Sequence, residues 1–194
     1  MQNSSKGFSS GAIVAIVVAV LAVLLLAVSY ISAYNAANQM EQTIKATYEN
    51  NQNILSTYQQ KVQEAAQVPG MMTDDIVKVT QAAITGRYGD NGSRAVFQAI
   101  AERNPQVSEK LYVKLQEIIE GGRDEFKTNQ TRLIDTKRAY ETSLGSFGRG
   151  TFMHLAGYPR INLADFKVVK TDSAVNAFRT GRESGPMQLR PSHQ

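Results

Sequence analysis

The chain is poor in residues that carry out chemistry. It has no cysteine, which excludes disulfides, thiolate metal sites, palmitoylation and a lipidated cysteine anchor. Its two histidines, His154 and His193, lie far apart in the sequence and lack the partners that a catalytic triad or a zinc site requires. G-x-S-x-G, H-E-x-x-H and a glycine-rich phosphate loop are also absent. We therefore predict no catalytic residue, no cofactor and no bound metal.

One stretch, Gly11 to Ile31, contains no charged residue and is dominated by Ile, Val and Leu. A helix over this stretch reaches about 30 Å, the thickness of the hydrocarbon core of a bilayer. The stretch exceeds the roughly 7 to 15 apolar residues of a signal peptide, and only Lys6 precedes it as a basic side chain. We therefore predict a retained transmembrane helix. The small residues Ala27 and Ser29 leave cleavage as a signal peptide open as an alternative.

Basic residues exceed acidic residues by a small margin and are not clustered. The formal net charge is +4, and Lys and Arg are interspersed with Asp and Glu along the chain. Binding of nucleic acid needs a basic patch on one face of the protein. We therefore expect no nucleic acid among the partners. The membrane and unidentified proteins are the expected partners, and a homo-oligomer is left open.

The segment after the apolar stretch has no helix breaker before Pro69 and Gly70. We therefore predict one uninterrupted helix from about Ser10 to Gln67. In its second half, residues at alternating spacings of three and four form one helix face, which predicts packing against other helices, as in a coiled coil. We interpret Asn51 on this face as solvated, with a register-setting polar contact as the alternative. The face consists of Ile44, Tyr48, Asn51, Leu55, Tyr58, Val62 and Ala65.

Two shorter helices are predicted next. Asp74 and Asp75 are expected in the first turn of the second helix, where acidic side chains stabilise the helix dipole. The run from Tyr88 to Ser93 is dense in turn residues, and it lacks the ligand spacing of a calcium-binding loop. We expect Ser93 to cap a third helix over Arg94 to Glu102.

The second long helix is predicted from about Pro105 to Ala156, antiparallel to the first, and Tyr158-Pro159 is expected to end it. Within it, Gly121 and Gly122 predict a close helix approach or a kink, with a hinge as the functional alternative. We expect the apolar faces of the long helices, and no ionic or metal site, to hold the domain together. The face of this helix consists of Leu111, Leu115, Ile119, Gly122, Phe126, Asn129, Leu133, Thr136, Tyr140, Leu144 and Phe147.

These elements predict an all-α fold in which an N-terminal transmembrane helix continues into an antiparallel helical bundle. Apolar residues after Pro159, such as Phe166 and Val169, are expected to dock on the bundle. The predicted organisation is a short polar tail over 1–10, the transmembrane helix over 11–31, the bundle domain over 32–170 and a disordered tail over 171–194.

Several motifs resemble those of the LemA family. The Tyr34-Asn35 pair lies just after the apolar stretch, as such a pair does in that family. Arg132 and Tyr140 match positions of the family's closing helix, and Pro159 follows an aromatic residue beyond it. The sequence departs from the family pattern after Tyr140, where Glu141 stands in place of asparagine. The resemblance implies a membrane-anchored helical bundle with a short outer N-terminus and a cytoplasmic domain.

The sequence thus favours a single-pass, membrane-anchored scaffold or adaptor that binds protein partners and is not an enzyme. A secreted, envelope-associated or virus-associated fibre that uses the apolar stretch as a signal remains an alternative. A membrane-tethered hydrolase or transferase with an unrecognised site is the other alternative.

Overall fold

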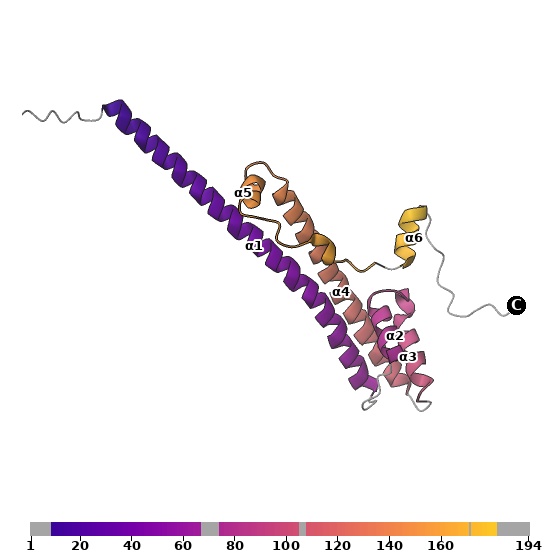
Figure 1. The fold of residues 1–194 in the computed structure, drawn as a ribbon. Helices are drawn as coiled ribbons and strands as arrows, with labels where there is room; N and C mark the ends of the chain where they lie inside the picture. The colour runs from indigo at the N-terminus through magenta and orange to yellow at the C-terminus, as the bar shows by residue number, and fades with distance from the viewer. Residues whose placement is uncertain (1–8, 67–73, 105–107, 171, 182–194) are drawn as a thin grey trace, which may run out of the picture. The chain divides into compact units, whose positions relative to one another are not determined.

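The computed structural model describes residues 9–66, 74–104, 108–170 and 172–181 (Figure 1). The helices are α1 (Ser10–Ala66), α2 (Asp74–Ile84), α3 (Gly92–Ala101), α4 (Glu109–Leu144), α5 (Arg149–Leu155) and α6 (Asp172–Thr180). Two short 3₁₀ helices, η1 (Gly89–Asn91) and η2 (Leu163–Asp165), lie between them. Within these ranges there is no strand. The predicted all-α fold is confirmed.

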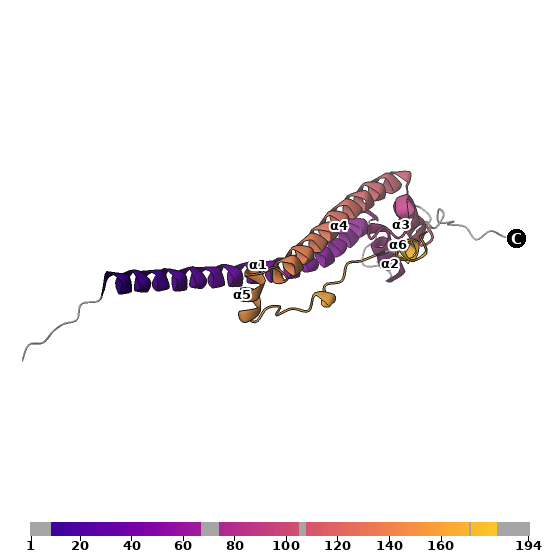
Figure 2. The same ribbon diagram turned by 90° about the horizontal axis from the view of Figure 1, so that it is seen from above.

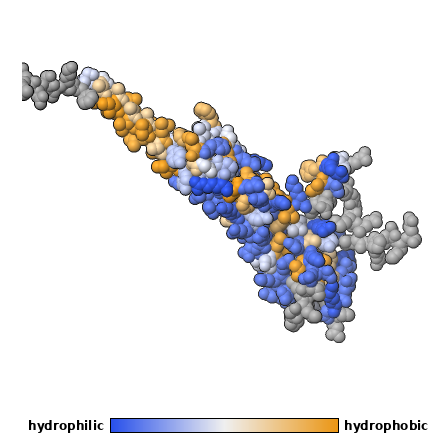
Figure 3. Space-filling model, in the orientation of Figure 1, coloured by the Kyte–Doolittle hydropathy of each residue, from blue (hydrophilic) through white to orange (hydrophobic). Residues whose placement is uncertain are grey.

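α1 is the uninterrupted long helix that the sequence predicts, and Gln67, Pro69 and Gly70 lie outside the described residues. Its large apolar side chains from Ile13 to Ile31 are exposed, and they form the hydrophobic surface over the first half of the helix in Figure 3. Among the described helices it is the one long and apolar enough to cross a membrane, and none of its most apolar 18-residue window is buried. An N-terminal signal sequence has the same properties.

Residues 32–170, for which the sequence predicts one domain, fall into two compact units. The span unit consists of Met1–Thr43 and Thr136–Leu163, and the core unit consists of Ile44–Asp135 and Ala164–Gln194. α1 and α4 contribute to both units, and in each unit α4 runs alongside α1 (Figure 1 and Figure 2).

Contacts within each unit show that α1 and α4 are antiparallel. In the core unit the Tyr58 hydroxyl donates to Glu125 at 2.9 Å, and the Asn129 amide donates to Asn51 at 3.0 Å. The order of contacts along α4 is therefore the reverse of their order along α1. In the span unit, Tyr140 likewise contacts Glu41. The antiparallel arrangement predicted for the two long helices is confirmed within each unit.

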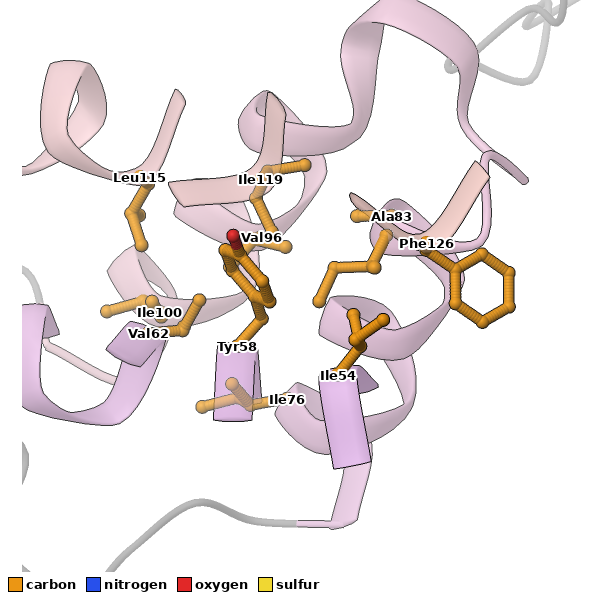
Figure 4. Packing of buried hydrophobic residues seen from close by; sticks show 11 residues of the cluster. Ile54, Tyr58, Val62, Ile76, Ala83, Val96, Ile100, Leu115, Ile119 and Phe126 are labelled. Carbon is orange, nitrogen blue, oxygen red and sulfur yellow. The ribbon is translucent and has the colours of Figure 1, made fainter. Parts of the chain in front are cut away.

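The hydrophobic core of the core unit is shared by four helices (Figure 4). α2 and α3 each present an apolar face because they are amphipathic, and these faces close over α1 and α4. On α1 the buried face differs by one residue from the predicted one at two places, where Thr47 and Ile54 are buried and Tyr48 and Leu55 are half-buried. The core consists of Ile54, Tyr58, Val62, Ile76, Ala83, Ile84, Val96, Ile100, Leu115, Ile119 and Phe126.

The prediction that the second long helix continues to Ala156 is wrong, and Pro105 lies outside the described residues. α4 ends at Leu144, and Phe147 is fully exposed. The reason lies in the glycines that follow, because Gly148 adopts φ +81°, a conformation that other residues rarely adopt and that turns the chain. α5 then folds back against the end of α4, so closely that a Cβ on Gly150 would lie 2.1 Å from the Leu144 carbonyl oxygen.

Two further local expectations are corrected by the structure. Ser93 does not cap the third helix, because α3 begins at Gly92 and Ser93 is buried inside its first turn. Gly92 at its start packs closely on α2, where an added Cβ would lie 3.1 Å from the Ala83 Cβ. The predicted disordered tail is wrong over Asp172–Thr180, which form α6, and residues 182–194 lie outside the described part of the chain.

The expected close approach at Gly121 and Gly122 is confirmed, and α4 continues through both glycines. A Cβ on Gly122 would lie 2.9 Å from the Tyr58 Cγ, whereas a Cβ on Gly121 would make an ordinary contact at 3.5 Å with the Tyr58 hydroxyl. Gly122→Ala should therefore destabilise the protein by about 1 to 3 kcal/mol through overpacking. Gly121→Ala should stabilise it by up to about 1 kcal/mol through helix propensity. Urea unfolding of both variants checks the opposite signs, and equal effects would contradict the close approach.

Candidate functional site: a glutamate, tyrosine and arginine cluster

Glu41 is a buried carboxylate on α1 in the span unit, and it is only 3% exposed. It follows Ala33 and Ala37 at spacings of four residues, and all three are buried, because a helix returns to nearly the same face after four residues. Glu41 Oε1 accepts hydrogen bonds from the Tyr140 hydroxyl at 2.5 Å and from the Arg160 backbone N–H at 2.7 Å. One carboxylate therefore ties α1 to α4 and to the segment after α5.

The Arg160 side chain continues this cluster on its exposed side. Its guanidinium lies over the ring of Tyr158 at 4.3 Å and over the ring of Tyr34 at 5.3 Å, both within cation–π range. The two rings meet edge to face with their centroids 5.7 Å apart. Arg160 Nη2 also donates to the Ala156 carbonyl at 3.2 Å. These contacts hold the segment after α5 against α1.

Burial shifts the acid–base behaviour of the tyrosines. Burial, then the hydrogen bond to Glu41 and its negative charge, raise the pKa of Tyr140 well above its usual value. Burial also raises the pKa of Tyr158. In the core unit, burial and the hydrogen bond to Glu125 raise the pKa of Tyr58. Each of these hydroxyls thus favours its neutral form in the folded protein, and those of Tyr58 and Tyr140 donate to carboxylates.

These shifts predict loss of stability at alkaline pH. Unfolded tyrosines ionise near pH 10, whereas Tyr58, Tyr140 and Tyr158 ionise later in the folded protein. Their contribution is therefore fully present below about pH 10 and is lost as the pH rises through the folded pKa values. A spectrophotometric titration of tyrosinate should show a late phase in the native protein that is reduced by Tyr140→Phe. A native curve that overlays the curve of the urea-unfolded chain would contradict this expectation.

A buried polar pair fixes the register in the core unit. The Asn129 Nδ2 donates at 3.0 Å both to Asn51 Oδ1 and to the Thr47 carbonyl. The interpretation of Asn51 as solvated is wrong, because its side chain is 4% exposed and the register-setting alternative describes it. Sequence periodicity could not decide between the two, since the partner lies on the other long helix.

The segment after Leu163 docks on the core unit as the sequence predicts. The Phe166 ring meets the Tyr48 ring edge to face at 5.5 Å, and the Val169 N–H donates to Gln130 Oε1 at 3.1 Å. Beside Val169 lies an open cavity of about 610 Å³ that is also lined by Arg123 and Lys127 of α4. In the part of the chain that the structure describes, no group of three or more His, Asp or Glu side chains could hold a metal.

The family-motif residues are only partly gathered into one place. Tyr34, Tyr140 and Pro159 lie in or beside the Glu41 cluster, and the Tyr158-Pro159 bond is cis. Asn35 is exposed on α1, and Arg132 is exposed on α4 in the core unit. The sequence interpretation missed Glu41, Tyr158 and Arg160 as members of the cluster.

One signal could have identified Glu41. Its spacing places it in phase with the small and apolar residues Ala33, Ala37 and Ile44, so a charged side chain falls on a buried helix face. A charge at such a position requires hydrogen-bond partners. The cluster supplies them, and its chemistry is that of a structural tie between three segments.

Comparison of the chain with protein-family models, with curated proteins and with solved structures finds no match, so the LemA resemblance stays a prediction.

Proposed function

We propose that the chain is a single-pass membrane protein of the LemA type, in which α1 anchors a helical bundle that serves as a scaffold for protein partners. The observation that supports this proposal best is the exposed aliphatic half of α1, which continues without a break into the packed half. Exposed aliphatic surface of this extent is costly in water and favourable in a bilayer. The anchor and the bundle therefore share one helix.

Retention of the anchor is favoured by a contact of its last residues. The Tyr30 ring meets the Phe152 ring of α5 edge to face at 6.5 Å, so the end of the apolar stretch belongs to the folded span unit. Cleavage after Ser29 would leave Tyr30 at a free chain end and weaken this contact. The proposed location of the bundle is the cytoplasmic side.

Alkaline carbonate extraction tests the anchor. Full-length protein should remain in the membrane pellet, and a chain that begins near Tyr34 should stay in the supernatant, because it lacks the apolar stretch. Recovery of full-length protein in the supernatant would contradict a retained span. Sequencing of the mature N-terminus separates a cleaved signal from a retained anchor, since a chain that begins at Tyr30 would establish cleavage.

The side of the membrane and the partners need separate measurements. Because the chain has no cysteine, Val113→Cys on the exposed surface of α4 is a unique labelling site. An impermeant thiol reagent should label it only after the cells are opened, and labelling of intact cells would contradict a cytoplasmic bundle. Crosslinking and affinity purification from native membranes should then recover a defined set of proteins, with an unrelated single-pass protein carrying the same tag as the control. Recovery of the same proteins by both would contradict the scaffold role.

A further inference from the structure

We infer that the turn between α4 and α5 and the exposed side of α5 rest on the surface of the membrane that α1 crosses. Phe147 and Leu155 would enter its headgroup region, with Arg149 beside them. The inference rests on the proposed anchoring by α1. It names the bilayer itself as the ligand of a surface that has no other assigned role.

Within the span unit, α5 lies at the end of the apolar stretch. Tyr30 stands one residue before the end of the apolar stretch, at the level where a helix leaves the hydrocarbon core. Phe152 of α5 contacts the Tyr30 ring, which places α5 at that level. The Tyr34 contact with Tyr158, just after α5, lies one helical turn farther along α1. α5 is therefore held beside the end of the span by one contact at its middle residue and one just beyond its C-terminal end.

Large apolar side chains are exposed at this place. Phe147, which precedes α5, is fully exposed, and Leu155 at the end of α5 is 70% exposed. Gly150 and Met153, also on α5, are buried. α5 thus has one side packed on its own unit and another side that presents apolar groups outward. Phenylalanine and leucine on a surface-lying segment insert into the boundary between headgroups and acyl chains.

The backbone holds Phe147 in this outward position. The Gly148 φ of +81° and the tight approach of Gly150 to the Leu144 carbonyl oxygen fix the turn on both sides of Arg149. The Phe152 N–H donates to the Gly148 carbonyl at 3.1 Å and continues the turn into α5. A constrained turn that holds a phenylalanine outward is suited to contact with a membrane surface.

The span unit is basic on the α5 side of the apolar stretch. There, residues 32–43 and 136–163 have a net charge of +2, from four basic and two acidic residues. One of the two acids, Glu41, is buried, so the net charge of the exposed side chains is more positive than +2. Arg149 is exposed next to Phe147 in the fold-back turn. Basic side chains near the membrane surface are attracted to anionic lipid. The four basic residues are Lys137, Arg138, Arg149 and Arg160.

Tryptophan fluorescence tests the inference in the full-length protein, because the chain contains no native tryptophan. Phe147→Trp introduces one indole at an exposed position, so it leaves the packing unchanged. The variant is reconstituted into vesicles of neutral or anionic lipid that carry bromine atoms near the headgroup end or near the terminus of the acyl chains. Phe178→Trp on α6, where the native ring is 93% exposed, is the matched control. Leu24→Trp, inside the apolar stretch, reports on the span itself.

The F147W emission should be shifted to shorter wavelength, and the shallow bromines should quench it more than the deep ones and more than they quench F178W. Anionic lipid should increase this quenching. Two results would overturn the inference. In the first, aqueous acrylamide quenches F147W and bromolipid does not; in the second, bromolipid quenches F147W no more than it quenches F178W. Either result would leave the turn around Phe147 as a surface for a protein partner. If deep bromines quench L24W, the anchor stands whatever F147W shows. If no bromolipid quenches L24W, the proposed function fails and the inference fails with it.

Discussion

Leu115→Ala should lower the free energy of unfolding by about 2 to 5 kcal/mol, the range for truncation of a buried leucine. Leu115 is fully buried in the core that α1, α2, α3 and α4 share (Figure 4). Removal of its side chain takes away buried apolar surface and leaves a cavity that surrounding helices fill only in part. Because four helices meet there, the loss affects the packing of the whole core unit.

Val113→Ala is the matched control for this prediction. Val113 lies two residues away on the same helix and is 57% exposed, so its truncation should change stability by no more than about 0.5 kcal/mol. Urea unfolding of the full-length protein in mild detergent, followed by circular dichroism, measures both variants. Similar losses for the two variants would show that the apolar face of α4 is not the one that the structure buries.

Glu41→Ala should destabilise the span unit by about 2 to 5 kcal/mol. A buried donor left unsatisfied, such as the Tyr140 hydroxyl, costs about 1 to 3 kcal/mol, and the part-buried Arg160 N–H adds a cost at the lower end of this range. The Tyr140 hydroxyl and the Arg160 N–H would both lose their acceptor. Tyr140 is fully buried, so water cannot easily replace the carboxylate there. Glu41→Gln keeps an oxygen acceptor at the same position and should cost less than Glu41→Ala.

Glu49→Ala provides the control, because Glu49 is an exposed acid on the same helix. Its loss should leave stability within about 0.5 kcal/mol of the parent. Hydrogen exchange of amides in residues 136–163 reports on the span unit directly, and Glu41→Ala should accelerate exchange there. Unchanged exchange would show that the carboxylate does not hold the segments together.

The sequence alone determined the features that depend on neighbours along the chain. An uncharged aliphatic run followed by many residues without a breaker is sufficient to specify α1, since helix propensity is a local property. The spacing of apolar residues on α4 likewise predicted the burial of Leu115, Ile119 and Leu133. The sequence also predicted the close approach at Gly122, because a glycine in the middle of a helix lowers its stability and is expected where a neighbouring side chain leaves no room for a Cβ.

The tertiary structure decided the features that depend on residues far apart in the sequence. Glu41 is a buried tie because Tyr140 and the Arg160 backbone meet it, and neither partner can be inferred from the region around Glu41. Asn51 is a register contact for the same reason, since Asn129 faces it from the other long helix. α4 ends at Leu144, although its spacing pattern continues to Phe147, because Gly148 permits a turn and α5 packs against the end of the helix. Helical periodicity specifies which side chains share a face, but the free energy that buries a polar group or ends a helix comes from the partners that the fold brings to it.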